Sequence, residues 1–451
     1  MKDLTQGSVV RHLVHMASFM AVSMLMQTLY LLADLYFVGR LGREAIAAVG
    51  VAGNLTMIVM ALTQMLSVGT TALLAHAAGR KDQAQAERIF NQSFAMSLLI
   101  SGAFAAIAFL LRDTYAHALS ADAATAELAK SYLNWFIPAL ALQFAMVTLG
   151  AALRATGVIK PAVGFQVLSV ALNIVFAPLL IFCLGPIPAL GVSGAALATF
   201  VAIVIANVGL VIYFNRRYHY VRFRPAEWQP QLRTWWAMLK VGLPAGAEFA
   251  LLTVYALLVY AIIRPFGAAA QAGFGIGLRV MQALFLPVVA LSFAVGPVVG
   301  QNFGGRHADR VRQTVWAALG LASAVMLVLT IVAWLEGPAL IRPFSSDPDV
   351  IAFGGEYLTI VSLNFLASGI AFSSSSVFQG IGNTIPPLLS TASRLVLFAL
   401  PALWLARTPG FHIRQVWYLS VASQLVQAVL VLLLLRRELA RKLKFDAVAA
   451  T

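Results

Sequence analysis

Long apolar segments dominate this sequence and follow one another at short intervals. Twelve segments contain about 20 or more mostly apolar residues, enough to cross the ~30 Å hydrocarbon core of a bilayer as an α-helix. The expected helices are 12–39, 46–75, 90–111, 127–153, 161–183, 190–214, 237–263, 270–300, 312–334, 351–380, 386–406 and 413–435. The pattern therefore predicts an all-α polytopic membrane protein with 12 transmembrane helices.

The composition supports this prediction. Of 451 residues, 61% are hydrophobic and 11% are charged, whereas soluble domains have roughly 45–50% apolar and about 25% charged residues. The net charge of +14 is typical of membrane proteins with lysine and arginine in cytoplasmic loops, and we expect no nucleic-acid partner. The single Cys183 excludes an intramolecular disulfide. The N-terminus leads directly into an apolar segment, so we expect no cleavable signal peptide.

Lysine and arginine are distributed unevenly between the two sets of connecting segments. If both termini are cytoplasmic, the cytoplasmic segments together with the helix ends next to them hold 21 of these residues, and the opposite side, counted in the same way, holds 8. The remaining two of the 31, Arg279 and Arg394, lie inside expected helices. This bias predicts a multi-pass protein of a prokaryotic cytoplasmic (inner) membrane with both termini in the cytoplasm.

The two halves of the chain repeat each other at a nearly constant offset of 225 residues. Tyr30 falls on Tyr255, and "RATGVIKP" from Arg154 matches "QGIGNTIP" from Gln379. Further pairs are Gly42 with Gly267, Gly50 with Gly275, Tyr132 with Tyr357, Gly157 with Gly382, Pro161 with Pro386 and, one residue out of step, "GRK" at Gly79 with "GRH" at Gly305. One offset shared by several helices indicates two similar halves.

Each half holds six expected helices, an even number, so both halves enter the membrane in the same direction. We therefore expect two six-helix bundles related by a pseudo-two-fold axis along the membrane normal, with the site between them. The N-terminal bundle is assigned to residues 1–220, a cytoplasmic linker to 221–236 and the C-terminal bundle to 237–451. Such an arrangement is typical of transporters.

The repeated segments resemble those of the multidrug and toxic compound extrusion (MATE) family, nearest to its prokaryotic DinF-like branch. The matching stretches include "QTLYLLADLYFVGRLGREAIAAVG", "LRATGVIKPAVG", "KVGLPAGAEFALL" and "VFQGIGNTIPPLL". The resemblance implies a secondary active multidrug efflux antiporter. Such a protein would export cationic or amphipathic compounds in exchange for protons by alternating access, with sodium as the alternative coupling ion.

The family's acidic positions carry over only in part. Asp34 occupies the acidic position of the first helix, in the family pattern Asp-x-x-x-Val-Gly-Arg. Positions that are acidic in some other members are occupied here by Ala177, Leu252 and Ser368. The resemblance therefore leaves Asp34 as the main ion-coupling residue and weakens the case for a NorM-type sodium site.

Asp34 lies inside an apolar run with no lysine or arginine within five residues. Ser23, Gln27, Tyr30 and Asp34 follow a spacing of i, i+4, i+7 and i+11, which places them on one face of a helix. Desolvation there disfavours the carboxylate relative to the carboxylic acid, so Asp34 could take up and release a proton. The alternative is an aspartate that bonds to Tyr30 or a neighbouring helix and only fixes packing.

The second half offers Glu248, which the repeat places on Ser23, and Tyr255 as polar cavity candidates. Glu248 could attract cations or hold a second proton, or it could be a protonated side chain that joins helices. Arg279 and Arg394 need a partner inside the membrane, and we expect a pair with Glu248 or a structural role. Adaptable apolar cavity candidates are Met20, Met24, Phe37, Met281, Phe285 and Phe372.

Two other classes of protein compete with a drug exporter. A lipid-linked oligosaccharide flippase of the same superfamily should have a basic cavity, whereas the cavity candidates here are acidic. A membrane enzyme needs a catalytic cluster, and the sequence contains no nucleophile motif, phosphate loop or metal-ligand spacing. We therefore expect no enzyme activity, cofactor or metal. The expected partners are small cationic or amphipathic compounds, protons and membrane lipid, and we expect a monomer.

Overall fold

The computed structural model describes residues 1–182 and 189–445, and within them the chain is helical without a strand. Cys183, the last residue of the expected helix 161–183, lies outside the described residues, as do residues 446–451. The helices are α1 Val9–Gly39, α2 Arg43–Gly79, α3 Gln83–Leu119, α4 Ala123–Ala155, α5 Ile159–Phe182, α6 Val192–Arg216, α7 Leu232–Ile263, α8 Ala268–Gly304, α9 Ala308–Ile341, α10 Pro348–Val361, α11 Asn364–Ile381, α12 Ile385–Leu405 and α13 Ile413–Lys442. Short 3-10 helices are η1 Pro225–Glu227, η2 Arg264–Phe266 and η3 Arg342–Phe344.

Eleven of the described helices are long and apolar enough to cross a membrane, and α10 with α11 makes up to 12. The predicted all-α polytopic fold is confirmed. The expected single helix 351–380 is instead broken into α10 and α11, with a bend of 58°. A break frees backbone carbonyl groups that need other partners inside a membrane. At this break the carbonyl oxygen of Ser362 accepts a hydrogen bond from the Phe365 backbone N–H at 2.9 Å. The Thr330 hydroxyl of α9 lies 2.8 Å from the Met326 carbonyl oxygen of its own helix and 3.1 Å from that of Ser362.

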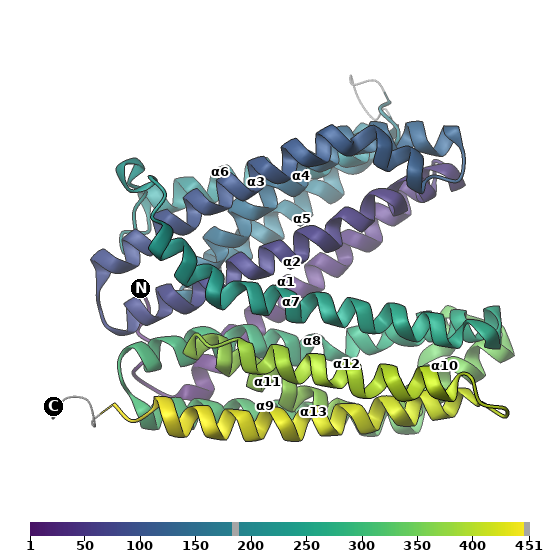
Figure 1. Cartoon of the computed structure of the whole chain (residues 1–451). Coiled ribbons are helices and arrows are strands. Elements are labelled where there is room, and N and C mark those ends of the chain that lie inside the picture. Colours follow the sequence, from purple (N-terminus) through teal and green to yellow (C-terminus); the bar gives the residue numbers. More distant parts are fainter. Residues whose placement is uncertain (183–188, 446–451) are drawn as a thin grey trace. The chain divides into compact units, whose positions relative to one another are not determined.

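The chain forms two compact units. The first comprises Met1–Asp3 and Phe19–Gly242, and the second comprises Leu4–Ser18 and Leu243–Thr451. α1 and α7 therefore contribute to both units. In the first unit α4 packs against α2, α3 and α6, and α5 packs against α6. In the second unit α8 and α9 pack against α10 and α11, and α13 packs against α11 and α12 (Figure 1). The contacts of α4 with α2, α3 and α6 in the first unit thus correspond to those of α10 and α11 with α8, α9 and α13 in the second.

The turns that follow α2 and α8 repeat at the level of the backbone. α2 ends at Gly79 and α8 ends at Gly304, 225 residues later. Two residues beyond these ends, Lys81 (φ 59°) and Arg306 (φ 58°) both adopt the left-handed conformation. The structure thus pairs Gly79 with Gly304 rather than Gly305, and the offset is not interrupted. The same offset relates the positive-φ glycines Gly42 with Gly267 and Gly157 with Gly382.

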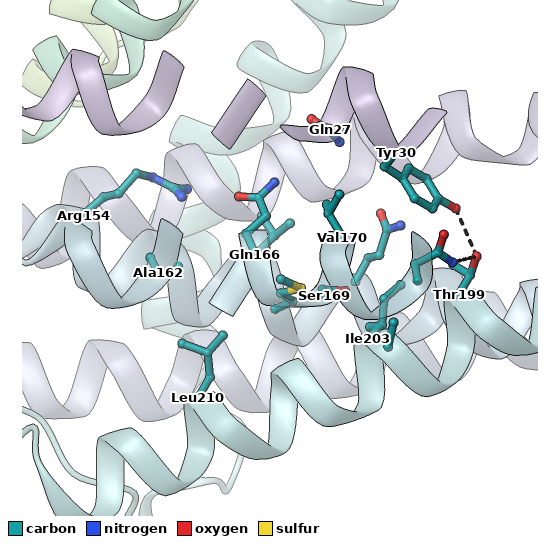
Figure 2. Close-up of a pocket in the computed structure, with 16 residues that line it drawn as sticks. Gln27, Tyr30, Arg154, Ala162, Gln166, Ser169, Val170, Thr199, Ile203 and Leu210 are labelled. Carbon is teal, nitrogen blue, oxygen red and sulfur yellow. Dashed lines mark hydrogen bonds between the residues drawn. The ribbon is translucent and has the colours of Figure 1, made fainter. Parts of the chain in front are cut away.

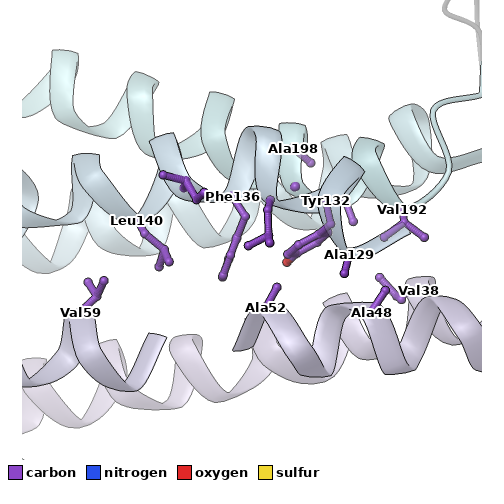
Figure 3. Packing of buried hydrophobic residues seen from close by; sticks show 14 of the residues in the cluster. Val38, Ala48, Ala52, Val59, Ala129, Tyr132, Phe136, Leu140, Val192 and Ala198 are labelled. Carbon is purple, nitrogen blue, oxygen red and sulfur yellow. The ribbon is translucent and has the colours of Figure 1, made fainter. Parts of the chain in front are cut away.

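Small side chains bring the helices of the first unit together. The core of this unit contains Ala48 and Ala52 of α2, Ala129 of α4 and Ala195 of α6, none more than 1% exposed. Helices in a membrane associate through such close contacts, because lipid provides no hydrophobic driving force between them. Figure 3 shows the row Ala48, Ala52 and Val59 on α2 facing the row Tyr132, Phe136 and Leu140 on α4.

Two glycines make the contact between α2 and the start of α7. A Cβ atom on Gly69 would lie 2.5 Å from the carbonyl oxygen of Met238. A Cβ atom on Gly242 would lie 2.2 Å from the carbonyl oxygen of Met65. Both distances are too short for any side chain, so these two backbones touch only because both positions are glycine.

The segment before α7 is fixed to α3 by polar side chains. Asn91 accepts hydrogen bonds from the Arg224 backbone N–H (2.8 Å) and the Trp228 indole N–H (3.0 Å). Arg224 also forms an ion pair with Glu87, at 3.0 Å. Gln92 donates to the carbonyl oxygen of Gln229, at 2.8 Å. This network makes the segment part of the first unit.

Candidate functional site

The first unit contains a pocket between α1, α4, α5 and α6. Its volume is about 170 Å³. The wall is rich in polar side chains, although all four helices are strongly apolar. Figure 2 labels five of them, Gln27, Tyr30, Arg154, Gln166 and Thr199, around a common space. Gln143 and Asn173 also line the pocket. Polar side chains that face inward from membrane helices mark candidate substrate or ion sites.

A hydrogen-bond network at one end of this pocket joins three helices. The Thr199 hydroxyl of α6 has one proton to donate, and the carbonyl oxygen of Ala195 lies within its reach at 3.2 Å. It accepts one from the Asn173 amide of α5 at 2.9 Å. The Tyr30 phenol of α1 lies 3.0 Å from the same oxygen, and either hydroxyl can be the donor of this hydrogen bond (Figure 2).

The polar face expected on the first helix is directed at this pocket. Gln27 and Tyr30 line it. Ser23 does not line it, but its hydroxyl donates to Gln166 at 2.5 Å, and Gln166 is part of the wall. Three of the four residues predicted to share a face therefore lie at or beside one pocket.

Asp34, the fourth residue of that face, lies one helical turn beyond Tyr30. Its side chain is buried, at 6% exposed, and it is not among the residues that line the pocket. Among the described residues its Oδ1 atom has no hydrogen-bond partner. Tyr30 and Tyr132 lie within electrostatic reach of the carboxylate. The hydrogen bond of the Tyr30 phenol is with Thr199 and not with Asp34.

Arg154 is a pocket residue that the sequence reasoning missed. The apolar run was expected to end at residue 153, but α4 continues to Ala155 and includes Arg154 in its last turn. Figure 2 shows this side chain at the end of the pocket away from Tyr30. It donates to the Ser67 hydroxyl at 2.9 Å, and Gly150, where a Cβ would lie 3.2 Å from Nη1, leaves room for it. No acidic residue is among the described residues that line this pocket.

Glu248 of the second unit has two hydroxyl partners. It accepts a hydrogen bond from Ser375 of α11 at 2.8 Å and one from Thr391 of α12 at 3.4 Å. The glutamate thus joins α7 to two other helices. Within the described part of the chain, neither Arg279 nor Arg394 forms an ion pair with it.

Arg394 lies instead over the ring of Tyr255. Its guanidinium carbon is 4.3 Å from the ring centroid, a cation–π contact that partly offsets the cost of a buried charge. The Tyr255 hydroxyl donates to Ser420 at 2.7 Å, and the Asn364 amide donates to the same oxygen at 3.2 Å. The second unit therefore also joins a tyrosine, a hydroxyl and an asparagine, but its asparagine comes from α11 and not from the counterpart of α5. Val259, at the position that corresponds to Asp34, is 2% exposed.

The apolar cavity candidates lie mostly in packing contacts. Met20, Met24 and Phe37 are not among the described residues that line the pocket of the first unit. Phe37 packs against Phe182, with ring centroids 6.5 Å apart. In the second unit Met281 accepts a hydrogen bond from Tyr357, and the ring of Phe285 packs against those of Phe365 and Phe372.

The two-unit fold and a polar pocket inside one bundle are features of a membrane transporter. A model of the MatE family matches residues 20–179 and again residues 244–405, once in each half. The chain belongs to the MatE family. The prediction of a transporter rather than an enzyme is confirmed, and the DinF-like branch stays a prediction.

Relatives match most of the chain. A multidrug export protein MepA from Staphylococcus haemolyticus is 26% identical over 380 residues, 84% of this chain and 82% of that protein. An FAD transporter from Shewanella oneidensis is 26% identical over 372 residues, 82% of each chain. A solved structure of an outward-facing multidrug resistance MATE family transporter of the MOP superfamily has a TM-score of 0.90 at 25% identity, with 98% of both chains covered.

Proposed function

We propose that this protein is a multidrug efflux antiporter that exports cationic or amphipathic compounds in exchange for protons by alternating access. The observation that carries the proposal is Asp34, a buried carboxylate with an unpartnered Oδ1 atom, one turn from the pocket-lining Tyr30. A charge with no partner inside the membrane is costly and indicates a functional group. The relative named as a multidrug export protein supports the substrate class.

Asp34 can couple export of the compound to entry of the proton, because its carboxylate can interact with only one of the two at a time. A cationic compound near the carboxylate stabilises its charged form and expels the proton. A proton that enters from the outside neutralises the carboxylate and removes the attraction for the cation. The two ligands thus compete for one group. Tyr30 and Gln27 lie between Asp34 and the rest of the pocket along α1, so they would contact the bound compound.

The test is transport by the purified protein in liposomes with an imposed pH gradient or an imposed sodium gradient. Wild type and Asp34→Asn are compared with a fluorescent lipophilic cation as substrate. We expect uptake driven by the pH gradient in wild type and its loss in Asp34→Asn. Asp113→Asn is the matched control, because Asp113 is an exposed carboxylate in ion pairs with Arg112 and Lys130. Undiminished uptake by Asp34→Asn would reject the coupling role, and a response to sodium alone would identify sodium as the coupling ion.

A second candidate function is export of an anionic compound, which Arg154 favours. A guanidinium without a carboxylate among the described pocket residues is suited to bind a phosphate or carboxylate group. The relative named as an FAD transporter carries a substrate of this charge. A lipid-linked oligosaccharide flippase is less well supported, because Arg154 is the one basic residue among those described in the pocket wall.

Arg154→Gln separates the two substrate classes. A charge-assisted hydrogen bond contributes about 1.5–3 kcal/mol, so we expect FAD efflux from liposomes to fall about 10-fold or more in this variant. Export of the lipophilic cation should be unchanged or faster. Arg216→Gln, at the exposed end of α6, is the control. If wild type does not export FAD, the anionic candidate is rejected.

A further inference from the structure

A second hollow lies on the second unit, outside the candidate pocket. It is a groove of about 1020 Å³ between α9 and α13, with Ile370 of α11 in its wall. The lining runs from Arg312 to Ser323 on α9 and from Val429 to Ala440 on α13. At 1.5 Å per residue, 11 steps of helix are roughly 16 Å. This length is close to one leaflet, since the hydrocarbon core of both leaflets is ~30 Å thick.

The groove is apolar along its length and basic at one end. Arg312 lies near the start of α9 and Arg436 near the end of α13, and both line the groove. Leucine, valine and isoleucine side chains form most of the remaining wall. The indole of Trp316, 73% exposed, lies one turn from Arg312. Tryptophan at this position is typical of the interface between lipid headgroups and hydrocarbon.

Both arginines have N–H groups to offer a ligand. Arg312 pairs with Asp309 through Nη1 at 3.1 Å, but both side chains are exposed and other guanidinium N–H groups of Arg312 are not used in this pair. Arg436 forms no ion pair with any residue of the described chain. Arg441, one turn further, is already paired with Glu438 at 2.7 Å. No acidic residue is among the described residues that line the groove.

Gly320 provides open space in the middle of the groove. A Cβ atom at this position would meet no atom within 4 Å. The missing side chain leaves the surface of α9 free beside the exposed Leu433 and Val429 of α13. A flexible hydrocarbon chain can fill such a space and gain the dispersion contacts that an empty gap lacks.

We propose that this groove is a binding site for an acidic phospholipid of the bilayer. One acyl chain lies along α9 and α13 beside Gly320, and the phosphate contacts the guanidinium groups of Arg312 and Arg436. Arginine is suited to this role because its planar fork matches the oxygens of a phosphate. The two positive charges oppose entry of an amphipathic cation, so the occupant is a lipid and not an exported drug.

Native mass spectrometry of the purified full chain in detergent tests the proposal. The probes are dioleoyl phosphatidylglycerol and dioleoyl phosphatidylcholine, which share acyl chains and differ in net charge. One basic residue near an acidic headgroup raises the affinity for the lipid about 5-fold, and two basic residues raise it about 30-fold. We expect wild type to bind phosphatidylglycerol more tightly than phosphatidylcholine. In the double variant Arg312→Gln/Arg436→Gln the ratio of the two affinities should be about 30-fold smaller.

A second variant tests the path of the acyl chain. Gly320→Leu fills the groove without meeting protein atoms, so the fold should be kept while binding of both lipids at this site falls. Gly102→Leu, at another glycine with open space on α3, should leave both unchanged. An unchanged lipid preference in the double arginine variant would overturn the proposal. Retention of the lipid adduct by Gly320→Leu would also overturn it. So would a Gly320→Leu variant that keeps the lipid but loses binding of the cation tetraphenylphosphonium, because the groove would then bind a cationic compound and not a lipid.

Discussion

Single polar residues inside apolar helices give this chain its candidate chemistry. Asp34 could be found from the sequence because a charge in such a run is conspicuous. Asn173 and Thr199 also stand among apolar residues, but only the rotation of α5 and α6 shows that Thr199 meets both Asn173 and Tyr30. Arg154 was missed because a helix can extend beyond the apolar run that predicts it. The sequence thus identifies isolated groups, whereas packing decides which of them meet.

The carboxylate of Asp122 predicts a pH-dependent contribution to stability. It caps α4 by accepting a hydrogen bond from the Thr125 backbone N–H at 2.7 Å. This bond, together with other contacts at the cap, holds the pKa of the Asp122 carboxyl below its usual range. A lowered pKa in the folded state stabilises the protein above the unfolded pKa, and this stabilisation is lost as the pH falls through the folded pKa.

Asp122→Ala should therefore lower the melting temperature at about pH 7, and the difference from wild type should shrink toward about pH 3. Thermal unfolding of the purified protein at a series of pH values provides the measurement. Asp122→Asn, which keeps a capping oxygen, should stay closer to wild type at neutral pH. A difference that does not depend on pH would contradict the role of the charge.

At the scale of helices, the apolar pattern predicts where the membrane-spanning helices lie, but it does not predict the break between α10 and α11. Each expected segment except 351–380 corresponds to one helix, and the ends differ by at most eight residues. The segment around Ser362 contains no proline or glycine at the break, so its local sequence gives no reason to divide it. At the break, a hydroxyl from another helix, that of Thr330, lies 3.1 Å from the Ser362 carbonyl oxygen. A tertiary partner of this kind cannot be recognised in a local pattern.

The glycine contact between α2 and α7 predicts a large effect from a small substitution. Gly69→Ala would place a methyl group 2.5 Å from the Met238 carbonyl oxygen, so the two helices must separate. Overpacking of this kind costs about 1–3 kcal/mol, and we expect a lower melting temperature in detergent. Gly53→Ala on the same helix meets open space and should not destabilise. Equal melting temperatures for the two variants would argue against a close contact here.

At the scale of the whole molecule, the repeat and the charge bias predict the orientation in the membrane. The turns at Lys81 and Arg306 correspond to each other and should both face the cytoplasm. Cysteines placed there, in a Cys183→Ser background, should react with a membrane-impermeant thiol reagent only after the cells are permeabilised. Cysteines at Ala121 and Ser346, beyond the far ends of α3 and α9, should react in intact cells. The reverse pattern would show that the chain is inserted in the opposite direction.

Val259, buried where the second half would carry the counterpart of Asp34, leaves the proposed cycle with a single exchangeable proton. Glu248 is already held by two hydroxyl groups. One proton exchanged for one monovalent cation moves no net charge across the membrane. Such a cycle is electroneutral, so the membrane potential adds nothing and the difference in proton concentration supplies the whole driving force. Export of an uncharged compound by the same cycle would be electrogenic.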